Sequence, residues 1–221
     1  MEFPEFILAE NSTNFPPVET ADENGILAIG SNLQVPTLLK AYKLGAFPWY
    51  GPNEPIIWYH PDPRFVLFPK DIKISRSMRS VLNSGKFLFK VNTDFKSVVR
   101  NCRIIQRKDQ ENAGTWITDA IEEAYFKLFQ EGHAISAEAW KDNKLVGGLY
   151  GVRMGNVFFG ESMFAQESNA SKFAFIKLIH LFKKQGVELI DCQVYTDHLH
   201  SLGAEHISRN YFIDLLQKLI P

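Results

Sequence analysis

The sequence predicts an α+β fold, and three observations in its second half carry that prediction. Two apolar segments, 145–152 and 156–164, are rich in β-branched and aromatic residues and are separated at Gly155, which is typical of neighbouring strands. Segment 168–186 has the apolar spacing of a helix, and segment 187–194 is typical of a buried strand. Because a helix separates the last two strands, we expect those strands to be parallel.

The helix expected within 168–186 has recognisable ends. Ser168, Asn169 and Ser171 offer oxygens that can cap its first turn, and Gly186 stands where a helix commonly stops. The apolar stripe that would face the sheet consists of Phe175, Leu178, Ile179 and Phe182. This helix is therefore expected to bury one face against the strands that flank it.

Composition limits the class of protein. The chain has 221 residues, of which 45% are apolar and 22% are charged, so it can bury a core as one or two domains. Its net charge of -1 gives no general attraction to nucleic acid, and any RNA contact must come from a local patch. No apolar run reaches the ~18 residues that span a bilayer, and the N-terminus lacks a basic signal-peptide region.

The two cysteines indicate the compartment. Cys102 and Cys192 both lie in apolar surroundings, which is typical of buried thiols rather than of a disulfide framework. Buried thiols suit a reducing environment. Together with the expected absence of a signal peptide and of a membrane span, they predict a cytoplasmic protein.

The first third of the chain alternates short elements with loops. Segment 24–30 is expected to be a strand and segment 36–44 a helix that ends at Gly45. Segment 46–64 is dense in aromatic residues and proline, which predicts a rigid aromatic loop without helix or regular strand. That loop is either the core of a small domain, which we favour, or a platform on which a base stacks.

The middle of the chain adds strands, helices and a basic stripe. Strands are expected at 65–68 and 87–91, and a basic turn at 74–79 leads into a helix. Asp94 begins a helix over 94–105. Four basic residues lie on the outer face of this helix and just beyond it: Lys96, Arg100, Arg103 and Arg107. Such a stripe is more often a solvated face than a phosphate-binding surface, and both interpretations stay open.

The remaining elements complete the prediction. Thr118 caps a helix that closes at Gly132. Segment 134–140 alternates as a strand, and Asp142-Asn143 is a hairpin turn into the strand at 145–152. The last helix covers 211–219. No apolar helix face is left without a partner, so a monomer is expected.

Three polar residues interrupt the apolar strands. Glu161 directly follows an apolar run, and Asp191 and Gln193 share one face of the last strand. The other face carries Ile190 and Cys192. Buried carboxylates and carboxamides need partners, and strand ends are common ligand sites, so the group is either a satisfied polar cluster or a functional site.

Several kinds of chemistry lack their motifs. There is no CxxC pair, HExxH or GxSxG sequence, and His198 and His200 are expected to be surface or capping residues. The element order resembles the GNAT acyltransferase fold. Members that use acyl-CoA carry a glycine-rich loop before the helix, whereas segment 165–172 here has no glycine. An acyl-CoA donor is therefore disfavoured.

Ten segments in one order resemble a specific family. They are NGILAIG (24–30), AYKLGAFPWY (41–50), WYHPDPRFVL (58–67), ISRSM (74–78), GTWIT (114–118), LVGGLYGV (145–152), GESMF (160–164), NASK (169–172), LIDCQV (189–194), and SLGA with Ile207 and Arg209. On these segments the chain resembles the leucyl/phenylalanyl-tRNA–protein transferase family. Departures from the family pattern are Gly30-Ser31-Asn32, where Gly-Gly-Asp is common, Ile135 in place of a His, and an end at Pro221.

This resemblance implies a fold and a function. It implies a small N-terminal α/β domain, residues 1–65, followed by a GNAT-like C-terminal catalytic domain, residues 66–221. It implies transfer of Leu or Phe, less often Met, from Leu-tRNA or Phe-tRNA to proteins that begin with Arg or Lys, which marks them for degradation. It implies no metal and no cofactor.

The resemblance also implies site residues. Asp191, Gln193 and Glu161 are the expected catalytic residues: Gln193 positions the attacking amine, Asp191 gives electrostatic help and Glu161 holds an ammonium group. The donor side chain is expected in a pocket lined by Leu149, Phe158, Met163, Phe175, Leu178 and Ile190. Trp49 and Trp116 flank the terminal adenosine, and Arg76 and Arg79 meet phosphates of the acceptor stem.

Two rival functions remain on the sequence alone. One is a CoA-dependent N-acetyltransferase of the same fold, which turnover of acetyl-CoA would reveal. The other is a non-catalytic RNA-binding module that uses the aromatic loop and the basic helix, which binding of uncharged RNA without transfer would reveal.

Overall fold

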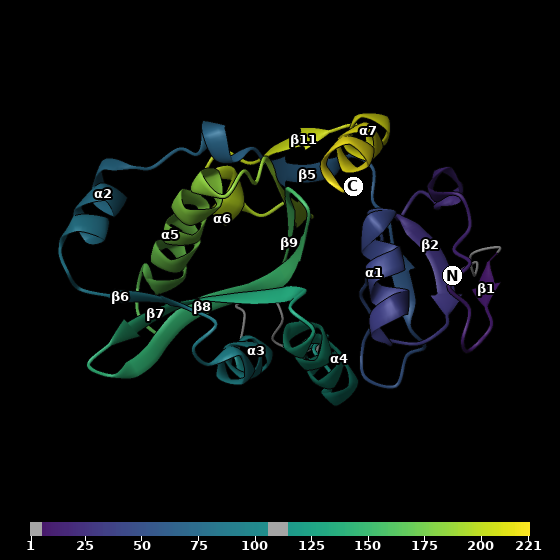
Figure 1. The fold of residues 1–221 in the computed structure, drawn as a ribbon, viewed down its shortest axis with the longest axis horizontal. Coiled ribbons are helices and arrows are strands. Elements are labelled where there is room, and N and C mark those ends of the chain that lie inside the picture. The colour runs from purple at the N-terminus through teal and green to yellow at the C-terminus, as the bar shows by residue number, and fades with distance from the viewer. Residues whose placement is uncertain (1–5, 106–114) are drawn as a thin grey trace.

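A computed structural model describes residues 6–105 and 115–221, and within them the strands form two sheets (Figure 1). The smaller sheet has the order β1-β2-β4-β3. Its strands are β1 (Ile7–Leu8), β2 (Ile26–Gly30), β3 (Phe47–Pro48) and β4 (Ile57–Tyr59). Helix α1 (Val35–Lys43) connects β2 to β3, and a short 3₁₀ helix, Val18–Thr20, precedes β2. These elements form the small N-terminal unit that the sequence predicts.

The larger sheet is mixed and has the order β11-β5-β10-β9-β8-β7-β6. Its strands are β5 (Arg64–Leu67), β6 (Leu88–Val91), β7 (Ala134–Lys141), β8 (Lys144–Met154), β9 (Val157–Ala165), β10 (Leu189–Gln193) and β11 (Glu205–Ile207). Strands β9 and β10 pair in parallel, which confirms the predicted crossover. The α+β class is confirmed. The boundary between residues 65 and 66 stays a prediction, and β5, which spans it, pairs in the larger sheet.

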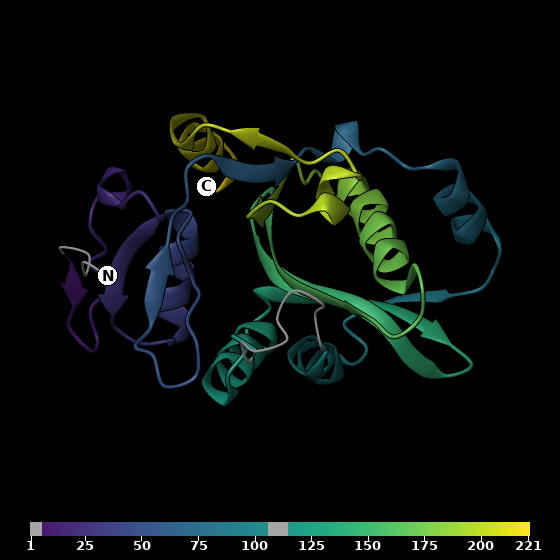
Figure 2. The same cartoon turned by 180° about the vertical axis from the view of Figure 1, so that it is seen from behind.

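Helices cover both faces of the larger sheet (Figure 2). One face carries α5 (Ala170–Lys184), with α2 (Arg76–Asn83) beside it. The other face carries α3 (Phe95–Ile104) and α4 (Asp119–Gln130). The chain also contains a 3₁₀ helix, Pro69–Asp71, the short α6 (Asp197–His200) and the last helix α7 (Arg209–Leu219). None of the helices in the described part of the chain is both long and apolar enough to cross a membrane.

Of the three helix starts for which capping residues were predicted, two are confirmed and one differs. The side chain of Asp94 accepts a hydrogen bond from the amide of Ser97, and the side chain of Thr118 accepts one from Ile121. Helix α5 begins differently, because Asn169 takes the left-handed conformation (φ 70°) and makes no side-chain cap. The prediction that the side chain of Asn169 caps this helix is therefore wrong. Asn169 instead forms a left-handed turn in the backbone, a conformation that Asn tolerates.

The aromatic segment 46–64 is more regular than predicted. Phe47 pairs with Tyr59 and Pro48 with Trp58, so the segment holds two short antiparallel strands. Trp58 is completely buried and donates its ring N–H to the carbonyl of Gly30 at 2.9 Å. The expectation of no regular strand is wrong, because cross-strand aromatic pairs stabilise strands too short to show alternation. The small-core interpretation of this segment is confirmed for Trp58 and Phe47.

The two units share one hydrophobic core. Its buried residues include Leu38 and Tyr42 of α1, Tyr125 of α4, Phe159 of β9 and Phe212 of α7. A second core lies between the other face of the larger sheet and α5. The shared core fixes α1 of the small unit against β9, and this contact brings residues of the small unit to the site described next.

Candidate active site

The carboxyl end of β10 holds a buried ion pair that the sequence did not predict. Arg64 donates from Nε to Asp191 Oδ1 at 2.8 Å and from Nη2 to Asp191 Oδ2 at 2.6 Å. Both side chains are inaccessible to solvent. The guanidinium lies 4.9 Å from the ring centre of Phe47 and 4.6 Å from that of Phe212. Asp191 is therefore neutralised by Arg64 within an apolar setting.

Asp191 also fixes the backbone of Gln193. Its Oδ1 accepts the backbone N–H of Gln193 at 2.9 Å. Gln193 has φ of +64°, and the amide of Val194 reaches back to the carbonyl of Cys192 at 2.8 Å, which makes a tight turn. A non-glycine residue in this conformation costs of order 1–3 kcal/mol and persists only where its surroundings hold it. Arg64 fixes the Asp191 carboxylate, and that carboxylate in turn holds the backbone N–H of Gln193.

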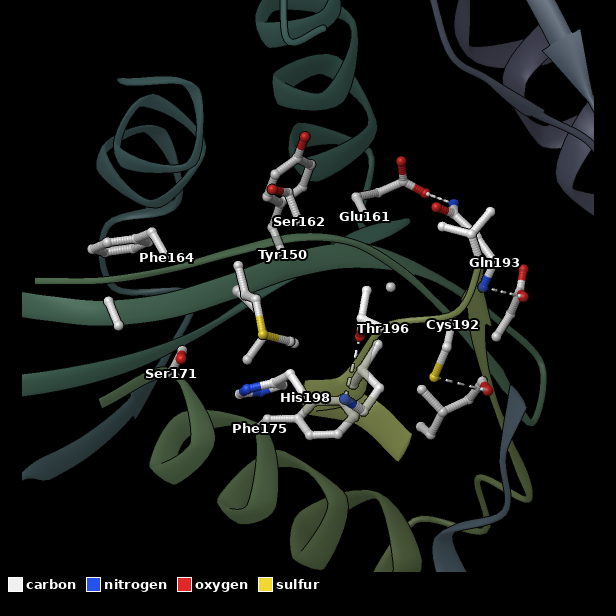
Figure 3. A pocket seen from close by; sticks show the side chains of 18 of the residues that line it. Tyr150, Glu161, Ser162, Phe164, Ser171, Phe175, Cys192, Gln193, Thr196 and His198 are labelled. Atoms are coloured by element: carbon white, nitrogen blue, oxygen red, sulfur yellow. Dashed lines mark hydrogen bonds between the residues drawn. The ribbon is translucent and has the colours of Figure 1, made fainter. Parts of the chain in front are cut away.

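Gln193 points toward Glu161 of the neighbouring strand (Figure 3). Its Nε2 donates to Glu161 Oε1 at 3.0 Å. Glu161 also accepts from two tyrosines that come from different units: Tyr42 of α1 at 2.7 Å and Tyr125 of α4 at 2.8 Å. The two tyrosine hydroxyls contact each other as well. The structure thus brings Asp191, Gln193 and Glu161 together, and each has partners.

Burial sets the protonation of this cluster. Protein surrounds the Glu161 carboxyl densely, and this desolvation raises its pKa from 4.5 to about 7, against the lowering effect of its hydrogen-bond donors. Burial, followed by the charge of Glu161, raises the pKa of both Tyr42 and Tyr125 well above 10, so these hydroxyls stay protonated. Burial also raises the pKa of the Cys192 thiol, which is therefore not a nucleophile at neutral pH.

A pocket of about 380 Å³ opens beside this cluster. Glu161 and Gln193 are among its polar lining residues, here called its polar rim, and most of its lining is apolar. Four of the six residues expected to line a donor pocket lie in its wall: Leu149, Met163, Phe175 and Ile190. The other two, Phe158 and Leu178, are fully buried in the core beneath α5 and are not among the lining residues. In Figure 3 Glu161 and Gln193 face each other, while Phe175 and His198 lie further along the pocket.

The residues expected to meet tRNA lie outside this pocket. Trp49 is 40% exposed and packs its ring 5.5 Å from that of Tyr59. Trp116 is partly buried against the shared core. Arg76 and Arg79 are exposed on α2, which lies at the end of the larger unit away from the small unit (Figure 1).

The basic stripe on α3 is partly engaged within the protein. Arg103 pairs with Asp119 and with Glu122, and Lys96 lies 3.9 Å from the ring centre of Phe126. Arg100 is exposed, and Arg107 lies outside the described residues. These internal contacts favour the solvated-face interpretation of the stripe.

Four residues of the site were not predicted as functional candidates from the sequence. Arg64, Tyr42 and Tyr125 hold the polar cluster. His198 lines the pocket with a buried Nε2 that has no hydrogen-bond partner among the described residues, and burial lowers its pKa to about 4. His198 is therefore a pocket residue, whereas a surface or capping role was expected. Its spacing to His200 gave no signal of a pocket position, because α6 is too short to show a period.

Comparisons with known proteins cover most of the chain and point to one family. Residues 66–217 match the model of the leucyl/phenylalanyl-tRNA protein transferase family, and residues 31–62 match that family's N-terminal domain. A leucyl/phenylalanyl-tRNA–protein transferase of Christiangramia forsetii is 52% identical over 91% of this chain and 95% of its own length. Those of Pseudomonas fluorescens and Yersinia enterocolitica are 46% and 48% identical, each over 96% of this chain.

Two solved structures are distantly similar to this chain. An aminoglycoside acetyltransferase from a soil metagenome is 16% identical over 62% of this chain and 90% of its own, with a TM-score of 0.39. The L-PGS of Bacillus licheniformis is 14% identical over 79% of this chain and 57% of its own, with the same TM-score. At such TM-scores neither match bears on the function of the site.

The sequence matches define an enzyme of the aminoacyl-tRNA-dependent transferase class, and its fold is α+β. Within that class, the chain belongs to the leucyl/phenylalanyl-tRNA–protein transferase family.

Proposed function

We propose that this protein transfers Leu or Phe, and less readily Met, from aminoacyl-tRNA to the α-amino group of proteins that begin with Arg or Lys. The observation that carries the proposal is the apolar pocket whose rim is formed by Glu161 and Gln193. An apolar amino-acid side chain fits the interior, and a reacting amine fits the polar rim. Such transfer marks the acceptor protein for degradation, and the donor implies a cytoplasmic location.

The reaction is the aminolysis of an activated ester. The acceptor α-amine, with a pKa of ~7.7–8.0, is already partly neutral near pH 7.5, so positioning supplies much of the rate. Gln193 would hold the amine through its carboxamide oxygen, since its Nε2 is engaged by Glu161. Asp191 would act on the reaction indirectly, because Arg64 and the Gln193 amide occupy its oxygens.

The donor side chain would occupy the pocket between Leu149, Met163, Phe175 and Ile190. Phe158 and Leu178 would support this wall from behind, where they are buried in the core. The terminal adenosine would lie against Trp49 and Trp116, with one ring stacking on the base.

Enlarging the pocket is expected to change donor preference. Met163→Ala removes a flexible side chain from the wall and should raise the ratio of kcat/KM for Phe over Leu about tenfold, since pocket contacts of this size are worth ~1–3 kcal/mol. The measurement is transfer from Phe-tRNA and Leu-tRNA to one acceptor peptide. Met154→Ala, on β8 outside the pocket, is the control. An unchanged ratio in Met163→Ala would remove Met163 from the donor site.

The exposed arginines of α2 are expected to make the binding of tRNA depend on salt. A double Arg76→Ala, Arg79→Ala variant should weaken tRNA binding and reduce the slope of log K against log salt by about 1 for each phosphate that the variant no longer binds. Arg103→Ala is the matched control, because Asp119 and Glu122 already engage that side chain. Equal slopes for the double variant and the native protein would exclude a phosphate patch on α2.

The first test of the function is transfer of labelled Leu from Leu-tRNA to a peptide that begins with Arg. A peptide that begins with Ala is the control for acceptor class. Transfer to the Arg peptide alone supports the proposal. Turnover of acetyl-CoA instead would favour an N-acetyltransferase, and binding of tRNA without any transfer would favour a non-catalytic RNA-binding module.

A further inference from the structure

Three oxygen-bearing side chains form a closed ring at the rim of the pocket. Glu161 accepts from Tyr42 at Oε1 and from Tyr125 at Oε2, and the two tyrosine hydroxyls contact each other. Both tyrosines are completely buried, whereas Glu161 keeps a partial opening to the pocket. The ring therefore meets a ligand only through the carboxyl group of Glu161.

The ring has one more contact than it has protons when Glu161 is ionised. Each tyrosine hydroxyl carries one proton and the carboxylate carries none, so two protons serve three contacts. If both hydroxyls point at Glu161, the contact between Tyr42 and Tyr125 holds no hydrogen. A proton added to Glu161 lets all three members donate in one direction around the ring. The arrangement can thus take up one proton without losing a hydrogen bond.

We infer that Glu161, Tyr42 and Tyr125 together accept the proton that the attacking amine gives up, an inference that rests on the aminoacyl transfer proposed above. Glu161 is the group that would touch the amine, because Gln193, the residue proposed to hold that amine, lies at 3.0 Å from Oε1. A carboxamide such as that of Gln193 is a weak proton acceptor, whereas the neighbouring carboxylate is a suitable one.

The charges around Glu161 fit this role. Desolvation, with a smaller contribution from Asp191 on β10, raises the pKa of Glu161 to about 7, and Arg64 on β5 pairs with the Asp191 carboxylate. Among the described residues, Tyr150 on β8 also interacts with both tyrosines of the ring and contributes to their raised pKa values. A base is most effective when its pKa lies near the working pH.

The proton balance of the step is complete. The neutral amine attacks the ester carbonyl carbon, the C–N bond forms, and the nitrogen becomes positively charged. One N–H proton passes to Glu161, and the C–O bond to the 3′ oxygen breaks. Glu161 passes this proton on to the leaving 3′ oxygen, which becomes a hydroxyl. One proton is lost by nitrogen and one is gained by oxygen, so the ring returns to its starting state after each cycle.

Two other roles would use the same contacts, and kinetics separates them. If Glu161 only held an ammonium group, Glu161→Gln would raise the acceptor KM and leave kcat unchanged. If the ring only joined α1 to α4, the Tyr→Phe variants would lose stability without any change in the pH profile. If the ring accepts the proton, Glu161→Gln lowers kcat by about 10²-fold or more, with the acceptor KM changed little.

The experiment measures kcat for Leu transfer to an Arg peptide from pH 5.5 to 9 at saturating substrates. Tyr42→Phe and Tyr125→Phe each remove a donor that lowers the pKa of Glu161, so the acidic limb of the profile should move to higher pH. The acceptor amine is the same in every reaction, so its own titration is constant. Tyr211→Phe, exposed on α7, is the control. Unfolding midpoints confirm that each variant is folded.

The outcomes separate the inference from the proposed function. Absence of transfer by the native protein contradicts the proposed function itself. Transfer by the native protein, with unchanged profiles in both tyrosine variants and an unchanged kcat in Glu161→Gln, overturns the proton-accepting ring alone. A shifted limb in the tyrosine variants together with a reduced kcat in Glu161→Gln supports it.

Discussion

Replacing Arg64 with methionine is expected to destabilise the folded protein by about 3–5 kcal/mol. Both members of the Arg64–Asp191 pair are inaccessible to solvent, so the variant leaves the Asp191 carboxylate buried without its counter-charge. Methionine keeps much of the length of the arginine side chain and its contact with the rings of Phe47 and Phe212. The loss therefore reports on the charge pair more than on packing.

Urea unfolding monitored by circular dichroism measures this effect. Arg103→Met is the matched control, because the pair of Arg103 with Asp119 is solvent-exposed and such pairs contribute little to stability. A double Arg64→Met, Asp191→Leu variant should recover most of the lost stability, since it leaves no buried charge. Equal midpoints for Arg64→Met and the native protein would show that the pair is not needed for the fold.

The same double variant is expected to remain inactive even where it is stable. Asp191 accepts the backbone N–H of Gln193, and leucine cannot do so. The double variant should therefore regain stability without regaining activity. Asp191 affects the reaction because it fixes the conformation of Gln193, and Arg64 affects it because it neutralises the charge of Asp191. Transfer at the native rate by the double variant would show that Asp191 is not needed to position Gln193.

The sequence is informative where a local pattern determines the structure. Helices α3 and α4 begin where Asp94 and Thr118 cap them, and the crossover between β9 and β10 follows from a helix of sufficient length. Strands β1, β3 and β11 have only two or three residues, so no alternation could reveal them. Their pairing depends on partners elsewhere in the chain.

In the polar cluster, the residues could be predicted from the sequence, but their partners could not. Glu161, Asp191 and Gln193 could be singled out because polar residues in apolar strands are costly without partners. Their partners could not be found this way, since Arg64 is 127 residues from Asp191 and Tyr42 is 119 residues from Glu161. In the sequence Arg64 closes the aromatic segment 46–64 and Tyr42 lies within the helix expected at 36–44, and neither position indicates a distant carboxylate partner.

Replacing Gln193 is expected to separate the effect of its side chain from that of its backbone. Gln193→Ala and Gln193→Gly both remove the carboxamide that contacts Glu161 and should lower kcat/KM about 10²-fold, because the amine loses its positioning group. The two variants should differ in stability. Gly adopts the left-handed conformation freely, whereas Ala does not, so Gln193→Gly should be more stable than Gln193→Ala by about 1 kcal/mol.

Single-turnover transfer and urea unfolding on the three proteins measure both quantities. If the Ala and Gly variants unfold at the same urea midpoint, the positive φ of residue 193 does not cost stability. If either variant transfers Leu at the native rate, the carboxamide is not part of the reaction site. The expected pattern, equal loss of activity with unequal stability, requires a site in which Asp191 and Arg64 hold Gln193 in an unfavourable conformation so that its side chain faces Glu161.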